Sequence, residues 1–256
     1  MIPTRLIEDI EPKMIARFID RKALFLQHWR FRKGGAGQPQ WNHRIRVELE
    51  PMLAARMEAG AGAGVWRPRA VLAVLPTWRV GDSLILGDGE GGRGNEVMRV
   101  RFVRNDRGSC IADVVPTMEE SGGDVHRTAW FACTLGPGAA NHEARLRAAG
   151  EFEEYHLFHG LSVALAEALA EEVHRMARIE LGIPDPPELT AADVVAGKYR
   201  GRRFSFGYPC CPDLELQVRL LEILGAARIG IAVNETFQME PELSVTAGVI
   251  SGCVEF

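Results

Sequence analysis

The residues best suited to holding a small molecule lie in one loop, residues 199–213, which reads YRGRRFSFGYPCCPD. Gly201 and Gly207 permit backbone angles that other residues avoid, while Pro209 fixes φ and lacks an N–H donor. Ligand contacts concentrate in loops that a rigid scaffold positions. This loop is therefore the first candidate for a binding site.

Arg203 and Tyr208 are the side chains of this loop that suit a ligand with a carboxylate and an aromatic ring. The aromatic residues Phe204, Phe206 and Tyr208 occupy alternate positions, so an extended segment would place their rings on one side. Ser205 lies between them. The same pattern also fits a tight turn that crosses the protein core, and the residue types alone leave both interpretations open.

A long helix is expected over residues 151–182, upstream of the loop. Its apolar residues recur every four positions and form a stripe that would face the core. Prolines between 184 and 187 end the helix. Glu167 lies two positions from its nearest stripe residues, and by itself this position is typical of a glutamate exposed to solvent. The stripe comprises Leu157, Leu161, Leu165, Leu169 and Val173.

Short apolar segments separated by turns predict an antiparallel sheet, as opposed to a doubly wound parallel one. The run VLAVLP ends at Pro76, and a second strand at 83–86 follows across a glycine turn. We therefore expect the α+β class, with helices around a twisted, mainly antiparallel sheet. Further strands are expected at 96–103, 111–115, 129–134, 229–233 and 245–250.

The chain is expected to form a single domain over residues 1–256, with a helical part at 1–66 and the main α+β body at 67–256. Apolar residues have helical spacing through 44–59, and a glycine-rich break follows at 60–64. Asp20 and Thr190 are each placed to cap the start of a short helix. Another helix is expected at 214–224.

Composition excludes several classes of function. A net charge of −4 over 256 residues gives no electrostatic reason to expect a nucleic-acid partner. We also expect no membrane partner, because no apolar run reaches transmembrane length. The N-terminus lacks a secretion pattern, and five scattered cysteines do not suggest a disulfide framework. A cytoplasmic protein is the expectation.

Several sequence blocks resemble the activation domain of cobalamin-dependent methionine synthases. The loop contains Arg-x-x-x-Gly-Tyr-Pro from 203, followed by Cys-Pro-Asp, which is similar to the family's S-adenosylmethionine-binding signature. The resemblance is collinear from about residue 10 to the end, and implies a helmet-shaped domain. The other blocks are Ile19-Asp20-Arg21, Ala23-Leu24-Phe25, Gln27-His28-Trp29, Arg79-Val80-Gly81-Asp82, Ile111-Ala112-Asp113-Val114-Val115, Leu165-Ala166-Glu167, Val173-His174-Arg175, Asn234-Glu235-Thr236-Phe237-Gln238-Met239 and Pro241-Glu242-Leu243-Ser244-Val245.

The resemblance implies roles for five residues in binding S-adenosylmethionine. Arg203 would bind the ligand's carboxylate, and Asp20 its ammonium group. Glu167 would lie near the sugar or the methionine moiety. Tyr208 would pack beside the ligand, and Ser205 would contribute its backbone.

The resemblance also implies partners. In the family, the domain supplies a methyl group to cobalamin held by another domain, while a donor such as flavodoxin supplies an electron. No Asp-x-His-x-x-Gly cobalamin-ligating sequence occurs here, so cobalamin is expected on a separate corrinoid methyltransferase, most simply methionine synthase. The chain is thus expected to be a stand-alone activation-type protein, an accessory subunit in reactivation and not a complete enzyme.

Two positions depart from the family pattern. Leu214 follows the Cys-Pro-acid run where the family commonly has histidine, and the C-terminus lacks the family's His-Pro turn and closing aromatic residues. Phe256 is the remaining candidate for that aromatic contact. These departures leave a second function open, in which the protein binds S-adenosylmethionine or a partner without supporting reactivation.

Overall fold

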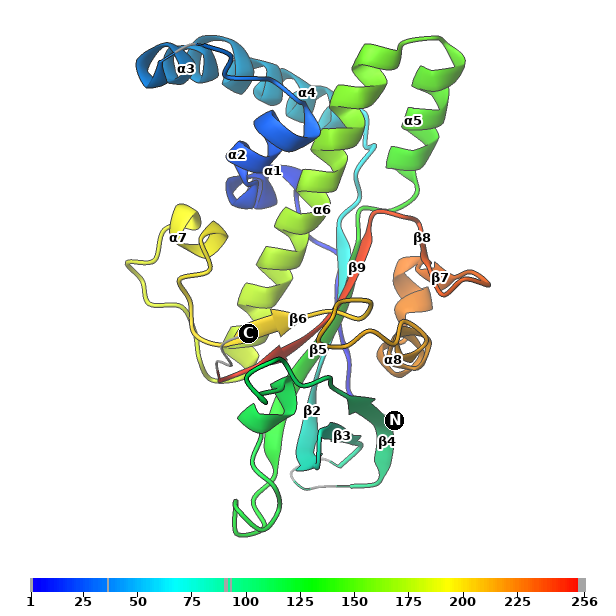
Figure 1. Cartoon of the computed structure of the whole chain (residues 1–256). Helices are drawn as coiled ribbons and strands as arrows, with labels where there is room; N and C mark the ends of the chain where they lie inside the picture. The colour runs from blue at the N-terminus through cyan, green and yellow to red at the C-terminus, as the bar shows by residue number, and fades with distance from the viewer. Residues whose placement is uncertain (1, 36, 90–91, 93, 253–256) are drawn as a thin grey trace.

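Figure 1 shows the computed structural model, which describes residues 2–35, 37–89, 92 and 94–252. One long helix, α6 (Phe152–Glu180), runs diagonally beside the sheet, and α3 and α4 lie across its upper end. The other helical segments are α1 (Pro12–Ile15), η1 (Ala16–Phe18), α2 (Arg21–Ala23), η2 (Leu24–His28), α3 (Gln38–Arg44), η3 (Ile45–Leu49), α4 (Glu50–Gly62), η4 (Ile111–Val114), α5 (Gly138–Ala148), α7 (Ala191–Val195), α8 (Leu216–Leu224) and η5 (Ala226–Ile229).

The main sheet is antiparallel and open, with the strand order β4-β3-β2-β5-β9-β6, and β1 pairs with β2 outside this path. The two longest strands, β2 and β5, pair over nine residues and form the middle of the sheet. The strands are β1 (Arg5–Ile7), β2 (Arg69–Val80), β3 (Ser83–Gly87), β4 (Glu96–Arg101), β5 (His126–Thr134), β6 (Arg202–Phe204), β7 (Ala232–Val233), β8 (Met239–Glu240) and β9 (Ser244–Ile250), of which β7 and β8 form a separate pair.

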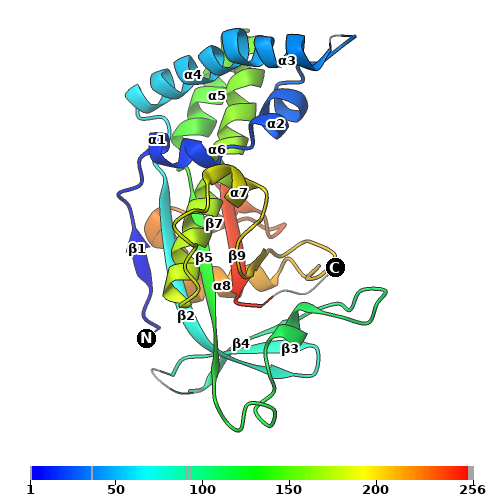
Figure 2. The ribbon, with the colours of Figure 1, turned by 90° about the vertical axis from the view of Figure 1, so that its left-hand side faces the viewer.

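Both faces of the sheet are buried, which explains the continuous apolar run in β2. Successive side chains of a strand point to opposite faces. Leu72 accordingly packs with α6 and the N-terminal helices, whereas Val71 and Leu75 pack with α8 on the other face. The two views in Figures 1 and 2 show α6 and α8 on opposite sides of the central strands.

Close packing joins the N-terminal helical segments to α6. A Cβ at Gly160 would lie 3.0 Å from the Cβ of His28, so this glycine lets η2 approach the helix. The indole N–H of Trp29 donates to the carbonyl of Leu157 at 2.8 Å, and that of Trp66 donates to Ser162 Oγ at 3.0 Å. Buried indole donors are thus satisfied where the helices meet.

The α+β prediction with an antiparallel sheet is confirmed, but the strand expected at 111–115 is wrong and the one expected at 229–233 is shorter than predicted. Residues 111–115 form a 3₁₀ turn because Asp113 accepts the backbone N–H of Cys110 and caps it. Ile229 ends the 3₁₀ helix η5, which the left-handed Gly225 and Gly230 flank, and of the expected strand only Ala232 and Val233 form β7. No helix was predicted at the position of α5. The division at residue 66 stays a prediction.

Candidate functional site

The loop that follows α7 is built around two left-handed glycines. Gly201 has a φ of +80°, and a Cβ there would lie 2.6 Å from the carbonyl oxygen of Ile250, which only glycine avoids. Gly207, with a φ of +82°, donates its N–H to the carbonyl of Cys211, and Cys211 donates to the carbonyl of Tyr208. This closed turn leaves the Tyr208 side chain 62% exposed.

The loop contains both of the arrangements that the sequence left open. Its first part is the edge strand β6, whose backbone pairs with β9, and its second part is a tight turn. Phe204 and Phe206 are buried against Trp130, at ring-centroid distances of 5.3 and 6.3 Å. Tyr208 does not share their buried environment, because the segment is not extended at that point and left-handed Gly207 reverses the chain before it.

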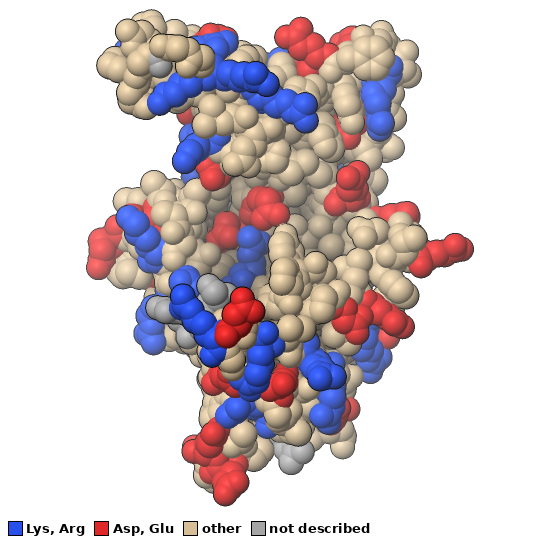
Figure 3. Space-filling model, viewed as in Figure 1, with Lys and Arg blue, Asp and Glu red and all other residues tan. Residues whose placement is uncertain are grey.

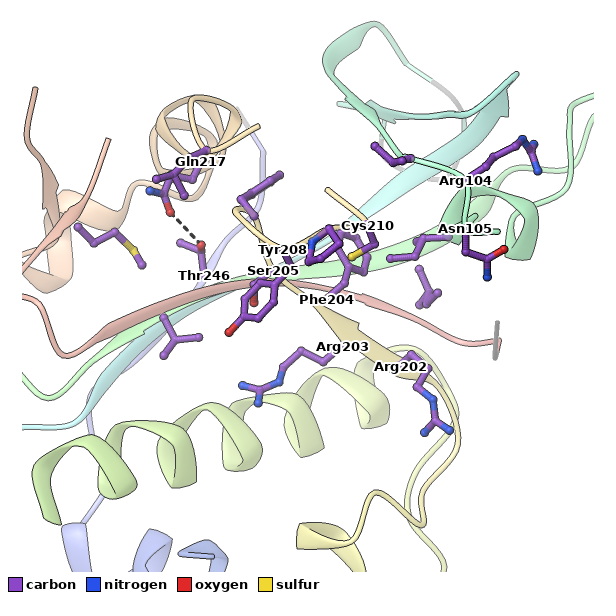
Figure 4. Close-up of a pocket in the computed structure, with 18 of the residues that line it drawn as sticks. Arg104, Asn105, Arg202, Arg203, Phe204, Ser205, Tyr208, Cys210, Gln217 and Thr246 are labelled. Atoms are coloured by element: carbon purple, nitrogen blue, oxygen red, sulfur yellow. Dashed lines mark hydrogen bonds between the residues drawn. The ribbon is translucent and has the colours of Figure 1, made fainter. Parts of the chain in front are cut away.

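Arg203 points from β6 toward α6 and forms two ion pairs there (Figure 4). Its Nη2 lies 3.2 Å from Glu167 Oε2 and 3.0 Å from Glu171 Oε1. A guanidinium has five N–H donors, and Nη2 carries two of them. Among the described residues, none accepts a hydrogen bond from Nε or Nη1 of Arg203. Three donors are therefore available to a ligand.

A groove of about 1350 Å³ opens at this point, and its wall includes the predicted residues Glu167, Arg203, Ser205 and Tyr208. Figure 3 shows a hollow in the middle of the corresponding face, where acidic and basic side chains meet. The structure thus brings together four of the six predicted site residues. This volume exceeds the roughly 300–1,000 Å³ of typical small-molecule sites, so the groove has room for a nucleoside with an amino-acid moiety.

The groove also has a polar wall that the sequence did not reveal. Thr246 Oγ1 lies 3.4 Å from Gln217 Oε1, and Gln217 also donates to the carbonyl of Phe237 (Figure 4). Gln217 is almost fully buried and comes from α8. In the sequence, Gln217 stands beside the apolar residues of that helix, and nothing marks it as a ligand-binding residue. Only the tertiary structure shows that it lines the groove.

Asp20 does not line the groove. Its carboxylate accepts the backbone N–H groups of Lys22 and Ala23, which confirms the N-cap prediction. Burial lowers the pKa of His28, and the carboxylates of Asp20 and Glu167 oppose that shift. Both carboxylates therefore act on the charge of His28.

The remaining sequence features at the site have simple outcomes. Leu214 lines the groove at the position where histidine was expected from the resemblance. Phe256 lies outside the described residues.

Burial raises the pKa of the Cys210 thiol and raises that of Cys211 to about 12, so both are thiols at neutral pH. Among the residues that the structure describes, no His, Cys, Asp and Glu cluster is arranged to bind a metal.

The fold and the groove define the class of this molecule. It is an α+β domain in which a long helix faces the edge of an open antiparallel sheet, with a groove between them. No helix in the described part of the chain is long and apolar enough to cross a membrane. The chain belongs to the family described as vitamin B12 dependent methionine synthase, activation domain, whose model matches residues 51–253. The resemblance inferred from the sequence is thereby confirmed.

Relatives and solved structures agree with this family. Methionine synthase of Mycobacterium leprae (strain TN) is 31% identical over 260 residues, covering 96% of this chain. That of Mycobacterium tuberculosis (strain ATCC 25618 / H37Rv) is 30% identical over 260 residues. The chain spans 22% of the length of each. A crystal structure of the MetH reactivation domain bound to AdoHcy has the same fold, with a TM-score of 0.86 and 22% identity over 100% of this chain and 80% of that one.

Proposed function

We propose that this chain binds S-adenosylmethionine in the groove and supports reductive remethylation of cobalamin on a separately encoded corrinoid methyltransferase, most simply a methionine synthase. The family membership, and the AdoHcy named for the structural neighbour, support this ligand class. The donor of the electron would be a flavodoxin-like protein. In this proposal the chain is an accessory subunit that works in the cytoplasm.

The observation that carries the proposal is the set of open donors on Arg203. Three N–H groups of a mostly buried guanidinium remain without a protein acceptor among the described residues, at the wall of a groove. Neither Nε nor Nη1 is among the fully buried atoms that lack a partner, so both remain accessible to solvent and to a ligand in the groove. A carboxylate binds a guanidinium through two parallel hydrogen bonds along an edge that includes Nη2, so an amino-acid carboxylate fits here by taking the Nη2 donor of Glu167 together with one open donor.

The other predicted residues have compatible positions. Glu167, 62% exposed, lies beside Arg203 and can attract a cationic group of the ligand. Asp20 offers a second carboxylate outside the groove lining, with its Oδ1 already occupied by the helix cap. Tyr208 extends an exposed ring at the rim, suited to pack on the adenosine part, and Ser205 lines the wall between them.

The chain's contribution to methyl transfer would be positional. The sulfonium of S-adenosylmethionine already contains a good leaving group, so holding its methyl group in line with the acceptor supplies much of the rate. Cobalamin on the partner would supply the reduced metal that accepts the methyl group. The residues described above would bind the ligand and orient it toward the open side of the groove.

Calorimetric titration with S-adenosylmethionine tests the ligand. Arg203→Ala should weaken binding by about 1.5–3 kcal/mol, or roughly tenfold to hundredfold, because it removes a charge-assisted hydrogen bond. Arg99→Ala is the control: it removes the same charge from an exposed residue of β4 that pairs with Glu96 and is not among the residues that line the groove. An Arg203→Ala affinity equal to that of the unmodified protein would place the ligand elsewhere.

The second candidate is a binding module that no longer supports reactivation, which Leu214 at the groove wall favours. The two functions separate in a reconstitution with a methionine synthase that lacks its own activation domain, S-adenosylmethionine and an electron donor. Recovery of methionine formation that Arg203→Ala abolishes would support reactivation. Saturable ligand binding without any recovery would support the binding module.

A further inference from the structure

Arg203, which lines the groove, forms an ion pair with Glu171, a carboxylate that does not itself line the groove. Glu171 lies one helical turn after Glu167 on α6, and its Oε1 is 3.0 Å from Arg203 Nη2. Its side chain is 15% exposed, against 62% for Glu167. The two carboxylates that share one nitrogen of Arg203 are therefore unlike: one is enclosed and the other is open to solvent.

Glu171 is in turn backed by a buried aromatic wall. Its Oε2 lies 3.6 Å from Nδ1 of His174, whose side chain is completely buried. The rings of His174 and Tyr199 pack edge to face, with their centroids 4.8 Å apart. The guanidinium carbon of Arg178 lies 4.1 Å from the centroid of the Tyr199 ring. These contacts leave Glu171 little room to change its rotamer.

We propose that Glu171 is the positioning residue of Arg203: it keeps the guanidinium paired and oriented, so that Glu167 can be exchanged for the ligand's carboxylate. This inference rests on the proposed binding of S-adenosylmethionine. A buried arginine that loses its only counterion pays a large desolvation cost. Because Glu171 stays in place, Arg203 can release Glu167 and accept a ligand carboxylate without that cost.

The arrangement also limits which donors of the guanidinium a ligand carboxylate would take. A carboxylate binds side-on through Nε and Nη2, as Glu48 binds Arg44, or end-on through Nη1 and Nη2, as Asp113 binds Arg104. Both edges include Nη2, so the ligand carboxylate would take the Nη2 donor that Glu167 releases together with Nε or Nη1, from which no described residue accepts, while Glu171 keeps the other Nη2 donor. Without Glu171, Arg203 would have Glu167 as its remaining partner, and a ligand carboxylate would have to compete for it. Carboxylate recognition should therefore weaken, whereas recognition of the rest of the ligand should not.

The test compares two ligands and two glutamates. Glu171→Gln should weaken S-adenosylmethionine binding about tenfold, while binding of decarboxylated S-adenosylmethionine, which lacks the carboxylate, should change less than about twofold. Glu172→Gln is the matched control. Glu172 is the next residue of α6, is similarly buried, and pairs with Arg17 and Arg175 away from the groove. It should change the melting temperature and leave both affinities as they are.

Two outcomes would overturn the inference: an unchanged or tighter S-adenosylmethionine affinity for Glu171→Gln, or an equal loss for both ligands. Glu171→Asp, which keeps the charge, should recover part of the affinity and serves if the glutamine variant does not fold. Rotation of the Arg203 guanidinium, measured by nitrogen NMR without ligand, should be faster in Glu171→Gln. That signal tests Glu171 even if the unmodified protein binds no S-adenosylmethionine, which would refute the proposed function instead.

Discussion

Adding a methyl group at Gly248, next to the groove residue Phe204, should lower both the stability of the protein and its affinity for the ligand. Gly248 of β9 is the cross-strand partner of Phe204 in β6 and of Trp130 in β5. A Cβ at this position would lie 2.4 Å from Cζ of Phe204 and 2.8 Å from Cζ3 of Trp130. Ordinary van der Waals contact begins near 3.4 Å, so Gly248→Ala requires the Phe204 ring to move by about 1 Å.

The Phe204 ring has no space into which to retreat. It meets Phe102 edge to face at 5.1 Å and Trp130 at 5.3 Å, and all three rings are buried. Overpacking of this kind costs about 1–3 kcal/mol. For a domain of this size, each kcal/mol lowers the melting temperature by about 2–4 °C, so a decrease of about 2–12 °C is expected. The displacement is transmitted to Arg203, the residue before Phe204.

Differential scanning fluorimetry and calorimetry with S-adenosylmethionine measure the two effects. Gly62→Ala is the matched control, because open space surrounds that glycine and alanine favours the helix by up to about 1 kcal/mol. Combining Gly248→Ala with Phe204→Leu should recover most of the lost stability. A Gly248→Ala protein with an unchanged or higher melting temperature would refute the steric argument.

Three further predictions use groups outside the groove. Arg178→Ala should lower the free energy of unfolding by about 3–5 kcal/mol in urea titrations, because it leaves the Asp185 carboxylate without its ion-pair partner. Arg178 donates to the two oxygens of that carboxylate at 2.7 and 2.5 Å. A loss below about 1 kcal/mol would contradict this prediction. Burial holds the pKa of His174 below its ordinary value, so the unfolded chain binds the proton first and stability falls as the pH drops below about 6.5. His174→Gln should remove up to about 1.4 kcal/mol per pH unit from that slope, and an unaltered slope would show that other groups cause it. Iodoacetamide at pH 8 should modify the half-buried Cys210 before the fully buried Cys211, as peptide mass spectrometry would show; the reverse order would mean that the turn opens.

Much of the fold follows from local patterns in the sequence. The leucine stripe predicted α6 to within two residues at each end, because a buried helical face needs apolar residues at this spacing. Thr190 was expected to cap a short helix, and its hydroxyl accepts the backbone N–H of Asp193. Where apolar content competed with capping, as at 111–115, the local hydrogen bonds decided the conformation. Apolar composition alone cannot show that competition.

The site was harder to predict, because its key contacts join distant segments. Arg203 and Glu167 are 36 residues apart, and a helical glutamate two positions from a leucine stripe is usually solvated. Glu167 is indeed 62% exposed, yet it pairs with Arg203. Glu171 carried a weak signal, since residues four apart share a helix face. Nothing in the sequence shows that β6 crosses that face, because strand pairing of β6 with β9 is a tertiary event.

The face of α6 opposite its leucine stripe contacts the segments that surround the site. It receives the N-terminal segment at its upper end, then Arg203, and finally Tyr199 near its lower end. These contacts recur at intervals of three, four or seven residues, which keeps them on one side of a helix with 3.6 residues per turn. The residues concerned are Gly160, Glu167, Glu171, His174 and Arg178.

This division of labour separates stability from recognition within one element. The apolar face of α6 buries leucines against the sheet and supplies the hydrophobic stabilisation. The opposite face is polar and uses ion pairs, whose strength depends on geometry more than on buried area. Because a helix is rigid over these distances, the spacing between the segment that carries Asp20 and the guanidinium of Arg203 is set by the turns of α6 between them. A ligand that reaches both would therefore be selected by its length as well as by its charges.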